Sequence, residues 1–434
     1  MLGPRDREIL RLAVPAFGAL VAEPLFLLSD SAIVGHLGTE SLGALGVAGQ
    51  ILATLVYLCV FLAYGTTAGV ARLVGAGDLR AAVRQGVDGV WLAALIGVAL
   101  VVLGFPLVPS LVDLFGASAA VAPHAETYLR VSLFGIPGML VVLAGTGVLR
   151  GLQDTRTPLA VSVGGFSVNL ALNALFVLVL DRGIAGSAAG TVLAQTGSAA
   201  VYVAVVLRAA RRHGASVRPD TAGLRTAATA GVALLLRTAA LRAVLLVGTS
   251  VAARMGDPQI AAYQVGFQIW TLLAFALDAI AIAGQAVTGR YLGAADPADA
   301  RDVTRRMVRW GVGCGVVFGA LVLAVRPWLP GLFTDDADVR RLLLASLIVV
   351  ALMQPVAGAV FVLDGILIGA GDGAYLARTT VLATAVFLPA ALAARHAGLV
   401  ALWLAIGLWM ATRLVTLTAR ARGDAWLVTG AVRH

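Results

Sequence analysis

Residues 22–38 read AEPLFLLSDSAIVGHLG, an apolar run that holds two carboxylic acids. Glu23 and Asp30 are just under two turns of an α-helix apart, so both lie on one helix face, about 10 Å apart along the axis. A carboxylate in hydrocarbon costs about 2.5 to 3.5 kcal/mol on insertion scales, so this face is expected to line a cavity or an ion path. Pro24 frees a backbone carbonyl and permits a kink there. The alternative is that both acids are buried structural hydrogen-bond acceptors.

The composition indicates a protein that crosses a membrane many times. Of the 434 residues, 60% are hydrophobic and 13% charged, and the mean hydropathy is +0.93. A soluble protein has about 25% charged residues. The net charge of +9 would suggest a nucleic-acid partner for a soluble chain. Here the charge reflects membrane topology, so no nucleic-acid partner is expected. Cys59 and Cys314 lie in apolar segments and imply no disulfide framework.

Apolar segments long enough to cross about 30 Å of hydrocarbon recur twelve times. With the N-terminus in the cytoplasm, 25 arginines lie on or beside the cytoplasmic side and seven on the outer side, so both termini are expected to be cytoplasmic. The N-terminus lacks a small-residue cleavage site and predicts an uncleaved first span. Arginine without lysine indicates a GC-rich bacterial genome, and hence a bacterial cytoplasmic membrane. The spans are expected at 12–35, 42–68, 87–111, 124–149, 158–180, 184–207, 229–253, 259–286, 308–330, 340–368, 376–395 and 398–419.

The two halves of the chain repeat each other at an offset of 218 residues. Six spans precede the basic segment from Arg208 to Arg225 and six follow it, so both copies have the same orientation in the membrane. Parallel repeats are typical of transporters whose substrate site lies between the halves. We expect an N-terminal lobe with the cation site at 1–207, a linker at 208–228 and a C-terminal lobe at 229–434. Matching pairs include Gln50 with Gln268, Arg72 with Arg290, Asp78 with Asp296, Pro137 with Pro355, Gly147 with Gly365 and Gly151 with Gly369.

One loop recurs in both halves, as ARLVGAGDLRAAVR at 71–84 and GRYLGAADPADARDVTRR at 289–306. In each, glycine ends one helix and aspartate stands near the start of an amphipathic basic helix. We expect this helix to lie at the inner membrane surface. No GKT or GKS follows, so a nucleotide-binding loop is not indicated.

Asn169 and Asn173 are one turn apart in the fifth span, at a height similar to that of Asp30. Amide oxygens facing a carboxylate would suit a hard cation or a proton. The alternative is that the asparagines join helices, as polar residues in bundles often do. In the sixth span, Thr191 and Gln195 are also one turn apart, and packing is the preferred interpretation of Gln195.

The second half carries its own intramembrane acids, Asp278 and Asp364. The repeat places Val60 and Thr146 opposite them, so the halves differ in chemistry. These acids would either bind a cationic substrate or stabilise a helix break. Further candidates for lining the substrate cavity are Gln50 and Gln285. No His-His-Glu set, cysteine pair or serine elbow has useful spacing, so we expect neither an enzyme nor a cofactor or structural metal.

Several segments resemble the multidrug and toxic compound extrusion (MATE) transporters, and specifically their DinF-like branch. The matching segments cover nearly the whole chain and are specific when taken together. They are LSDSAIVGHLG, GVLRGLQDTRTPL, NLALN, GIAGSAAGTVLAQ, ARMGDPQIAAYQV, DAIAIAGQAVTGRYLG and FVLDGILIGAGD. The resemblance implies an all-α membrane protein of twelve helices in two lobes. These lobes would alternate between outward and inward states and export substrate against an inward flow of protons or sodium.

The resemblance also implies a cation site in the N-terminal lobe. Its residues would be Asp30, Glu23, Tyr128, Asn169, Asn173, Thr191 and, where the family often has asparagine, Thr146. The family usually has aspartate where this chain has Asn173, and a neutral group where it has Glu23. Two acids on one helix repel each other when both are ionised, which suits proton binding. We therefore expect proton coupling, with sodium at Asp30, Asn169 and Asn173 as the alternative.

These observations predict a secondary antiporter that exports a small organic compound, cationic or amphipathic, and works as a monomer in the lipid bilayer. One rival is a flippase for a lipid-linked precursor, which should show a more cationic central cavity. Another is an exporter of an organic acid, which demands cavity arginines, and only Arg237 and Arg242 are remote candidates. A lipid-modifying membrane enzyme would need acidic or histidine residues clustered in interfacial loops.

Overall fold

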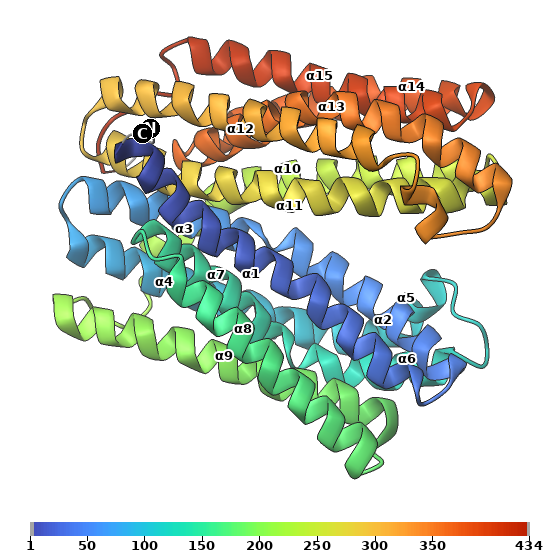
Figure 1. Cartoon of the computed structure of the whole chain (residues 1–434). Helices are drawn as coiled ribbons and strands as arrows, with labels where there is room; N and C mark the ends of the chain where they lie inside the picture. The colour runs from blue at the N-terminus through green and yellow to red at the C-terminus, as the bar shows by residue number, and fades with distance from the viewer. Residues whose placement is uncertain (1–3, 432–434) are drawn as a thin grey trace. The chain divides into compact units, whose positions relative to one another are not determined.

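The computed structural model describes residues 4–431, without the side chains of residues 4, 23 and 25–28. Within this range the chain is helical and has no strand, which confirms the predicted all-α class (Figure 1). The helices are α1 (Pro4–Gly35), α2 (Thr39–Leu58), α3 (Phe61–Gly75), α4 (Leu79–Gly104), α5 (Val108–Leu114), α6 (Ala122–Leu133), α7 (Ile136–Gly151), α8 (Arg156–Asn173), α9 (Gly183–His213), α10 (Thr221–Ala253), α11 (Asp257–Gly293), α12 (Pro297–Val325), α13 (Ala337–Gly369), α14 (Gly373–Ala397) and α15 (Leu399–Arg422).

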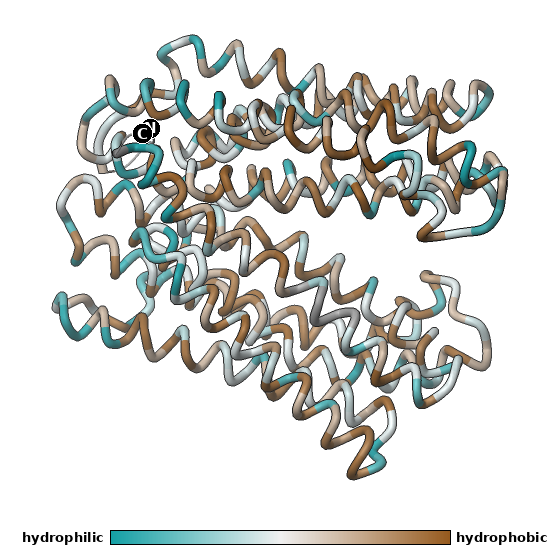
Figure 2. Tube along the Cα trace, in the orientation of Figure 1, coloured by the Kyte–Doolittle hydropathy of each residue, from teal (hydrophilic) through white to brown (hydrophobic). Residues whose placement is uncertain are grey.

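The helices have the length and hydropathy of membrane spans. Ten segments of the described residues qualify singly or as continuous pairs, and α6 with α7, bent by 51°, makes an eleventh. The remaining long helix is α1, whose 32 residues include the undescribed side chains. Figure 2 shows apolar residues along the helices and hydrophilic residues gathered at helix ends and connections. The chain is therefore a multi-pass membrane protein, as predicted.

The chain divides into two compact units. We call Gly18–Val232 the N-unit, and Met1–Phe17 together with Ala233–His434 the C-unit. The predicted lobe boundaries at 207 and 229 stay a prediction. The basic segment between the halves is largely helical, because α9 continues to His213 and α10 begins at Thr221, which leaves only 214–220 as an irregular connector.

Contacts at matching glycines support the repeat. A Cβ atom at Gly147 would lie 2.4 Å from the carbonyl oxygen of Ala63, and one at Gly365 would lie 2.4 Å from that of Ala281. Both members of each contact are related by the offset of 218 residues, so the same two helices touch at the same point in each unit. Only glycine allows such an approach of two backbones. The same relation holds for a second pair of contacts, Gly97 with Pro137 and Gly315 with Pro355.

One helix is central in each unit. In the N-unit, α7 packs against α3, α4 and α9. In the C-unit, α13 packs against α11, α12 and α15. Since the second half of α13, residues 354–369, is the repeat of α7, this shared packing confirms the prediction of two repeats with a common fold.

Candidate functional site

The carboxyl group of Asp30 is the centre of a buried polar cluster in the N-unit. Asp30 lies near the end of α1 and is 3% exposed. Its Oδ1 accepts hydrogen bonds from Asn173 Nδ2 at 2.6 Å and from Ser187 Oγ at 3.2 Å. These donors come from α8 and α9, so one carboxyl oxygen joins three helices. Both donors are neutral, which leaves the charge of an ionised Asp30 without a cation among these hydrogen-bond partners.

The two asparagines of α8 form the second layer of this cluster. Asn173 Nδ2 also donates to Asn169 Oδ1 at 2.7 Å, and both residues are fully buried. The Asn173 amide therefore uses both of its hydrogens. Within the described residues, Asn173 Oδ1 and Asn169 Nδ2 have no hydrogen-bond partner. Such atoms are costly to bury, so the cluster keeps capacity for a further hydrogen bond or a bound ion.

A change of helix type follows directly on Asn173. The last turn of α8 gives way to a π-helical segment, Ala174–Val179. π-Helical turns are rare and often occur at functional sites, because the wider turn shifts the direction of the side chains around it. The buried amide of Asn173 stands where this shift begins.

Tyr128 and Thr191 complete the predicted group. Tyr128 on α6 is 4% exposed and lies close enough to Asp30, Ser187 and Thr191 to interact with them. The Thr191 hydroxyl is buried and has no hydrogen-bond partner among the described residues. The structure thus brings Asp30, Asn169, Asn173, Tyr128 and Thr191 together, while their role as a cation site stays a prediction.

Ser187 is a member of this cluster that was not predicted from the sequence. In the sequence it lies within GIAGSAAGTVLAQ, among small residues that are typical of close helix packing. It lies four residues before Thr191 on α9 and is completely buried. The one-turn spacing to Thr191 was the available signal, because it places both hydroxyls on one helix face.

Three other predicted site residues, Glu23, Thr146 and Gln50, form no described contact with the Asp30 cluster. The side chain of Glu23 lies outside the described residues. Thr146 donates from Oγ1 to the hydroxyl of Tyr202 at 2.8 Å. Gln50 on α2 is exposed, and its carbonyl oxygen accepts from Thr54 Oγ1.

The C-unit contains a different cluster around Asp364. Its carboxylate on α13 pairs with Arg237 of α10, through a short contact and a second bond from Nε at 3.3 Å. It also pairs with Arg413 of α15 at 3.1 Å. All three side chains are buried. This Arg237–Asp364–Arg413 triad ties three helices together, and the carboxylate faces two fixed cations.

Arg413 of this triad lies near the end of the last predicted span and is only 5% exposed. Its guanidinium lies 5.1 Å from the ring centroid of Trp409. A guanidinium can remain charged in such a place because the carboxylate and the aromatic face both stabilise it.

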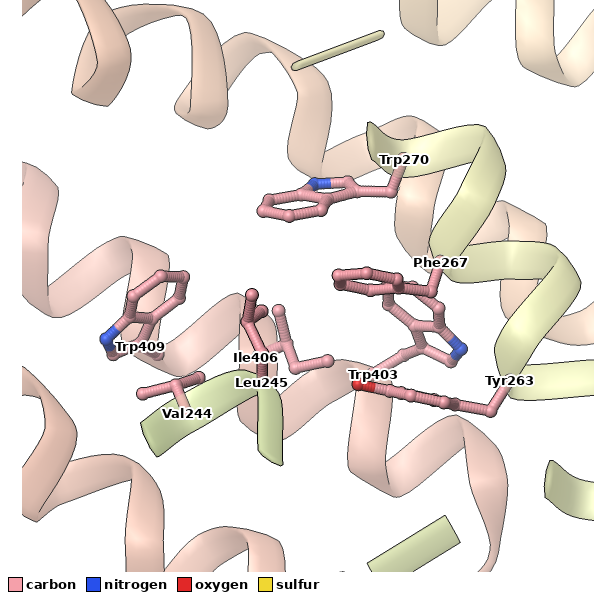
Figure 3. Close-up of a pocket in the computed structure, with 8 residues that line it drawn as sticks. All are labelled: Val244, Leu245, Tyr263, Phe267, Trp270, Trp403, Ile406 and Trp409. Atoms are coloured by element: carbon pink, nitrogen blue, oxygen red, sulfur yellow. The ribbon is translucent and has the colours of Figure 1, made fainter. Parts of the chain in front are cut away.

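Trp409 also lines a small aromatic pocket (Figure 3). Tyr263 and Phe267 project from α11, and Tyr263 packs against Trp403 at 5.6 Å between ring centroids. The cavity holds about 10 Å³, room for one water at most. It is a packed core and not a substrate cavity in this state. Its lining residues are Val244, Leu245, Tyr263, Phe267, Trp270, Trp403, Ile406 and Trp409.

The remaining C-unit candidates are both on α11. Asp278 is half-buried. Gln285 is 1% exposed, and its Oε1 has no hydrogen-bond partner among the described residues. A Cβ at Gly369 would lie 2.3 Å from the Gln285 carbonyl oxygen, so α11 and α13 are in backbone contact here. Gln285 therefore lies at a tight helix crossing.

Comparison with known proteins gives the same family throughout. The MatE family model matches residues 15–175 and 233–393. The chain is 31% identical to Protein DETOXIFICATION 44, chloroplastic, of Arabidopsis thaliana, over 95% of this chain and 82% of that protein. It is 29% identical to DNA damage-inducible protein F of Escherichia coli strain K12, over 95% of this chain and 91% of that one.

A solved structure of a MATE protein has the same fold. A MATE protein crystallised in the bent conformation aligns with a TM-score of 0.89 at 23% identity, over 98% of this chain and 96% of its own. This likeness shows the fold. The family model matches both halves at the repeat offset, and the relatives match over nearly the whole chain. The predicted resemblance is therefore confirmed: the chain belongs to the MATE family of membrane transporters, whose members are not enzymes.

Proposed function

We propose that this transporter is a secondary antiporter that exports organic compounds, driven by protons entering through the Asp30 cluster. The observation that carries the proposal is a buried carboxyl group whose two hydrogen-bond donors, Asn173 and Ser187, are neutral. A buried acid without a cationic partner takes up a proton readily, since burial disfavours the charged form. It can therefore load and release a proton during a cycle.

The neighbouring amide supports a proton over sodium. Asn173 directs Nδ2 and not its carbonyl oxygen at Asp30. After protonation, a turned amide could accept from the new hydroxyl through Oδ1, so Asn173 serves both protonation states. Sodium would need several oxygens directed at one point. Sodium at Asp30, Asn169 and Asn173 is the alternative, and it requires the Asn173 amide to turn its oxygen toward Asp30.

Protonation would loosen α1. An ionised Asp30 holds α8 and α9 through charge-assisted hydrogen bonds, which are about twice as strong as neutral ones. Neutralising the carboxyl group weakens both bonds at once. The helix is then free to bend near Pro24 and to change the cavity of its lobe. Proton and substrate compete through this conformational equilibrium even when they bind different residues.

The substrate in this proposal is a cationic or amphipathic organic compound, in line with a family of multidrug and toxic compound transporters. The carboxyl group of Asp30 makes the N-unit site acidic, and an acidic site favours a cationic substrate. We propose that the protein works as a monomer in a bacterial cytoplasmic membrane with both termini inside, because one chain already contains both repeats.

Export of an organic acid is a second candidate, and the Arg237–Asp364–Arg413 triad favours it. In this cluster two buried arginines share one carboxylate within the C-unit. A change of state that moves Arg413 away from Asp364 would present a guanidinium to a substrate carboxylate.

The test is efflux of ethidium from proteoliposomes under an imposed proton or sodium gradient. We expect native protein to use the proton gradient and Asp30→Asn to lose the driven efflux. Asp113→Asn is the matched control, since Asp113 is exposed near the end of α5. If neither gradient drives ethidium efflux and Asp30→Asn behaves as native, cation export is wrong. Driven efflux of a labelled tricarboxylate would then favour the second candidate.

A further inference from the structure

Two exposed arginines on α12 form no ion pair with the described residues of the C-unit. Arg305 and Arg309 are one turn apart on the same helix face, and both are exposed. The ion pairs of the described residues do not include either of them. Like charges at this spacing destabilise a helix by about 0.2 to 0.5 kcal/mol. An anion between them would remove that cost.

The arginines line an open pocket of about 150 Å³ together with Asp302 and Arg306. Asp302 forms an ion pair with Arg5, which also pairs with Asp299 at 2.6 Å, and Arg306 forms an ion pair with Asp6 at 2.8 Å. Three arginines and one carboxylate line the pocket, so its lining carries a net positive charge. The guanidinium groups of Arg305 and Arg309 are therefore available in this pocket to bind an anion from outside the protein.

The same face of α12 continues as an apolar stripe. From Arg309 it runs over Gly313 to Val316, Val317 and Leu321, all of which are exposed. A Cβ at Gly313 would meet nothing within 4 Å, so the surface of the helix is open there. A charged pocket that opens onto an apolar track along a membrane-spanning helix matches a molecule with an anionic head and a hydrocarbon tail.

In the other copy, the connector at 214–220 partly covers the matching face. On α4, Asp88 and Trp91 occupy the positions that match Arg306 and Arg309. Trp91 Nε1 donates to the carbonyl oxygen of Val217 at 3.0 Å, and Asp88 Oδ1 accepts from the backbone N–H of Asp220 at 3.2 Å. The connector thus satisfies the polar groups of α4. The described part of the chain supplies no such cover for Arg305 and Arg309.

We infer that this α12 pocket binds the phosphate headgroup of an anionic phospholipid, whose acyl chain lies along the stripe from Gly313 to Leu321. Guanidinium groups bind phosphate oxygens bidentately, and basic pockets at the membrane surface select anionic lipids. The positive-inside prediction places this end of α12 in the cytoplasmic leaflet. The inference is independent of which substrate the transporter exports.

Native mass spectrometry of delipidated protein, titrated with phosphatidylglycerol, tests the inference. We expect one tightly bound lipid, and Arg305→Gln/Arg309→Gln should weaken its apparent Kd roughly 10- to 30-fold. Arg395→Gln, which removes an exposed arginine at the end of α14, is the matched control and should bind as native. Phosphatidylcholine should bind native protein as weakly as the double variant binds phosphatidylglycerol.

A second variant distinguishes a lipid from a phosphate ion. Gly313→Phe places a ring on the apolar stripe without changing charge, and should weaken phosphatidylglycerol binding while the melting temperature is kept. Millimolar inorganic phosphate should not displace the lipid. If the double arginine variant binds phosphatidylglycerol as native protein does, the inference is wrong. It is equally wrong if phosphate displaces the lipid and Gly313→Phe has no effect, since the pocket then holds a free anion.

Discussion

The buried acids of the two units have opposite surroundings. Asp30 in the N-unit accepts from an amide and a hydroxyl, whereas Asp364 in the C-unit is held between two guanidinium groups. An acid among neutral donors can exchange its proton, while an acid between two cations stays ionised and acts as a structural link. One backbone arrangement therefore holds an acid among neutral donors in one copy and an ion-pair cluster in the other, and we propose that only the first exchanges a proton.

The repeat offset shows at which positions the two units differ. The positions that match Arg237, Asp364 and Arg413 in the N-unit are Ala19, Thr146 and Gln195, none of which is charged. The position that matches Asp30 in the C-unit is Gly248, where the hydroxyl of Tyr263 would lie 2.5 Å from an added Cβ. Each unit thus places its charges where the other has small or neutral side chains.

The largest effect should come from breaking the triad. Asp364→Leu leaves Arg237 and Arg413 buried without their shared carboxylate and should destabilise the protein by about 3 to 5 kcal/mol. The triple variant Arg237→Met/Asp364→Leu/Arg413→Met should recover most of that loss, because no buried charge is left. Thermal unfolding in detergent measures both. A triple variant no more stable than Asp364→Leu would contradict a structural role for the triad.

The shared backbone should respond equally in both units. Gly147→Ala and Gly365→Ala each force apart two helices in backbone contact, at a cost of about 1 to 3 kcal/mol. Gly164→Ala on α8 meets nothing within 4 Å and is the control that should be neutral or slightly stabilising. The same unfolding assay applies. A cost at one site only would show that the repeats differ in packing as well as in charge.

A second acid beside Asp30 should shift the pH dependence of transport. Asn173→Asp puts a carboxyl group where the amide nitrogen now lies 2.6 Å from Asp30. Two carboxylates so close share a proton and hold it to higher pH. The pH at half-maximal efflux should rise by roughly one unit, equivalent to about 1.4 kcal/mol. An unchanged or lowered pH midpoint would mean that Asp30 does not carry the transported proton.

The smallest effect should come from Ser187→Ala. This change removes one hydrogen bond to Asp30 and should cost about 1 kcal/mol of stability. Because the ionised form loses a donor, the pH midpoint of efflux should also rise, though less than in Asn173→Asp. Ser167→Ala on α8, an exposed serine bonded only to its own helix, is the control. A fall in the pH midpoint would place Ser187 outside the proton site.

Much of the fold could be predicted from the sequence because the signals are long. Apolar runs of span length and one constant offset over both halves are properties of many residues, so local irregularities do not hide them. The assignment of the first part of α1 to the C-unit could not be predicted. Ion pairs such as that of Arg290 with Glu8 join this segment to residues nearly 300 positions away, and the sequence does not show which distant residues pair.

The polar sites were predictable only where partners follow each other on one helix. Asn169 and Asn173 are one turn apart, so their joint face could be read directly. Ser187 resembled a packing residue because it is small and follows glycine. The burial of Arg413 was not predicted, because the residue lies near the end of the last predicted span. Its partner Asp364 is on another helix, and such a pairing is visible only once the helices are packed.

Proton release on substrate binding tests the central claim most directly. Purified protein in weakly buffered detergent solution is mixed with ethidium, and the pH change is recorded for native protein, Asp30→Asn and the triple triad variant. We predict that native protein and the triple variant release about one proton per chain, and that Asp30→Asn releases none while still binding ethidium. Release that persists in Asp30→Asn and disappears in the triple variant would contradict the account and assign the exchangeable proton to the C-unit.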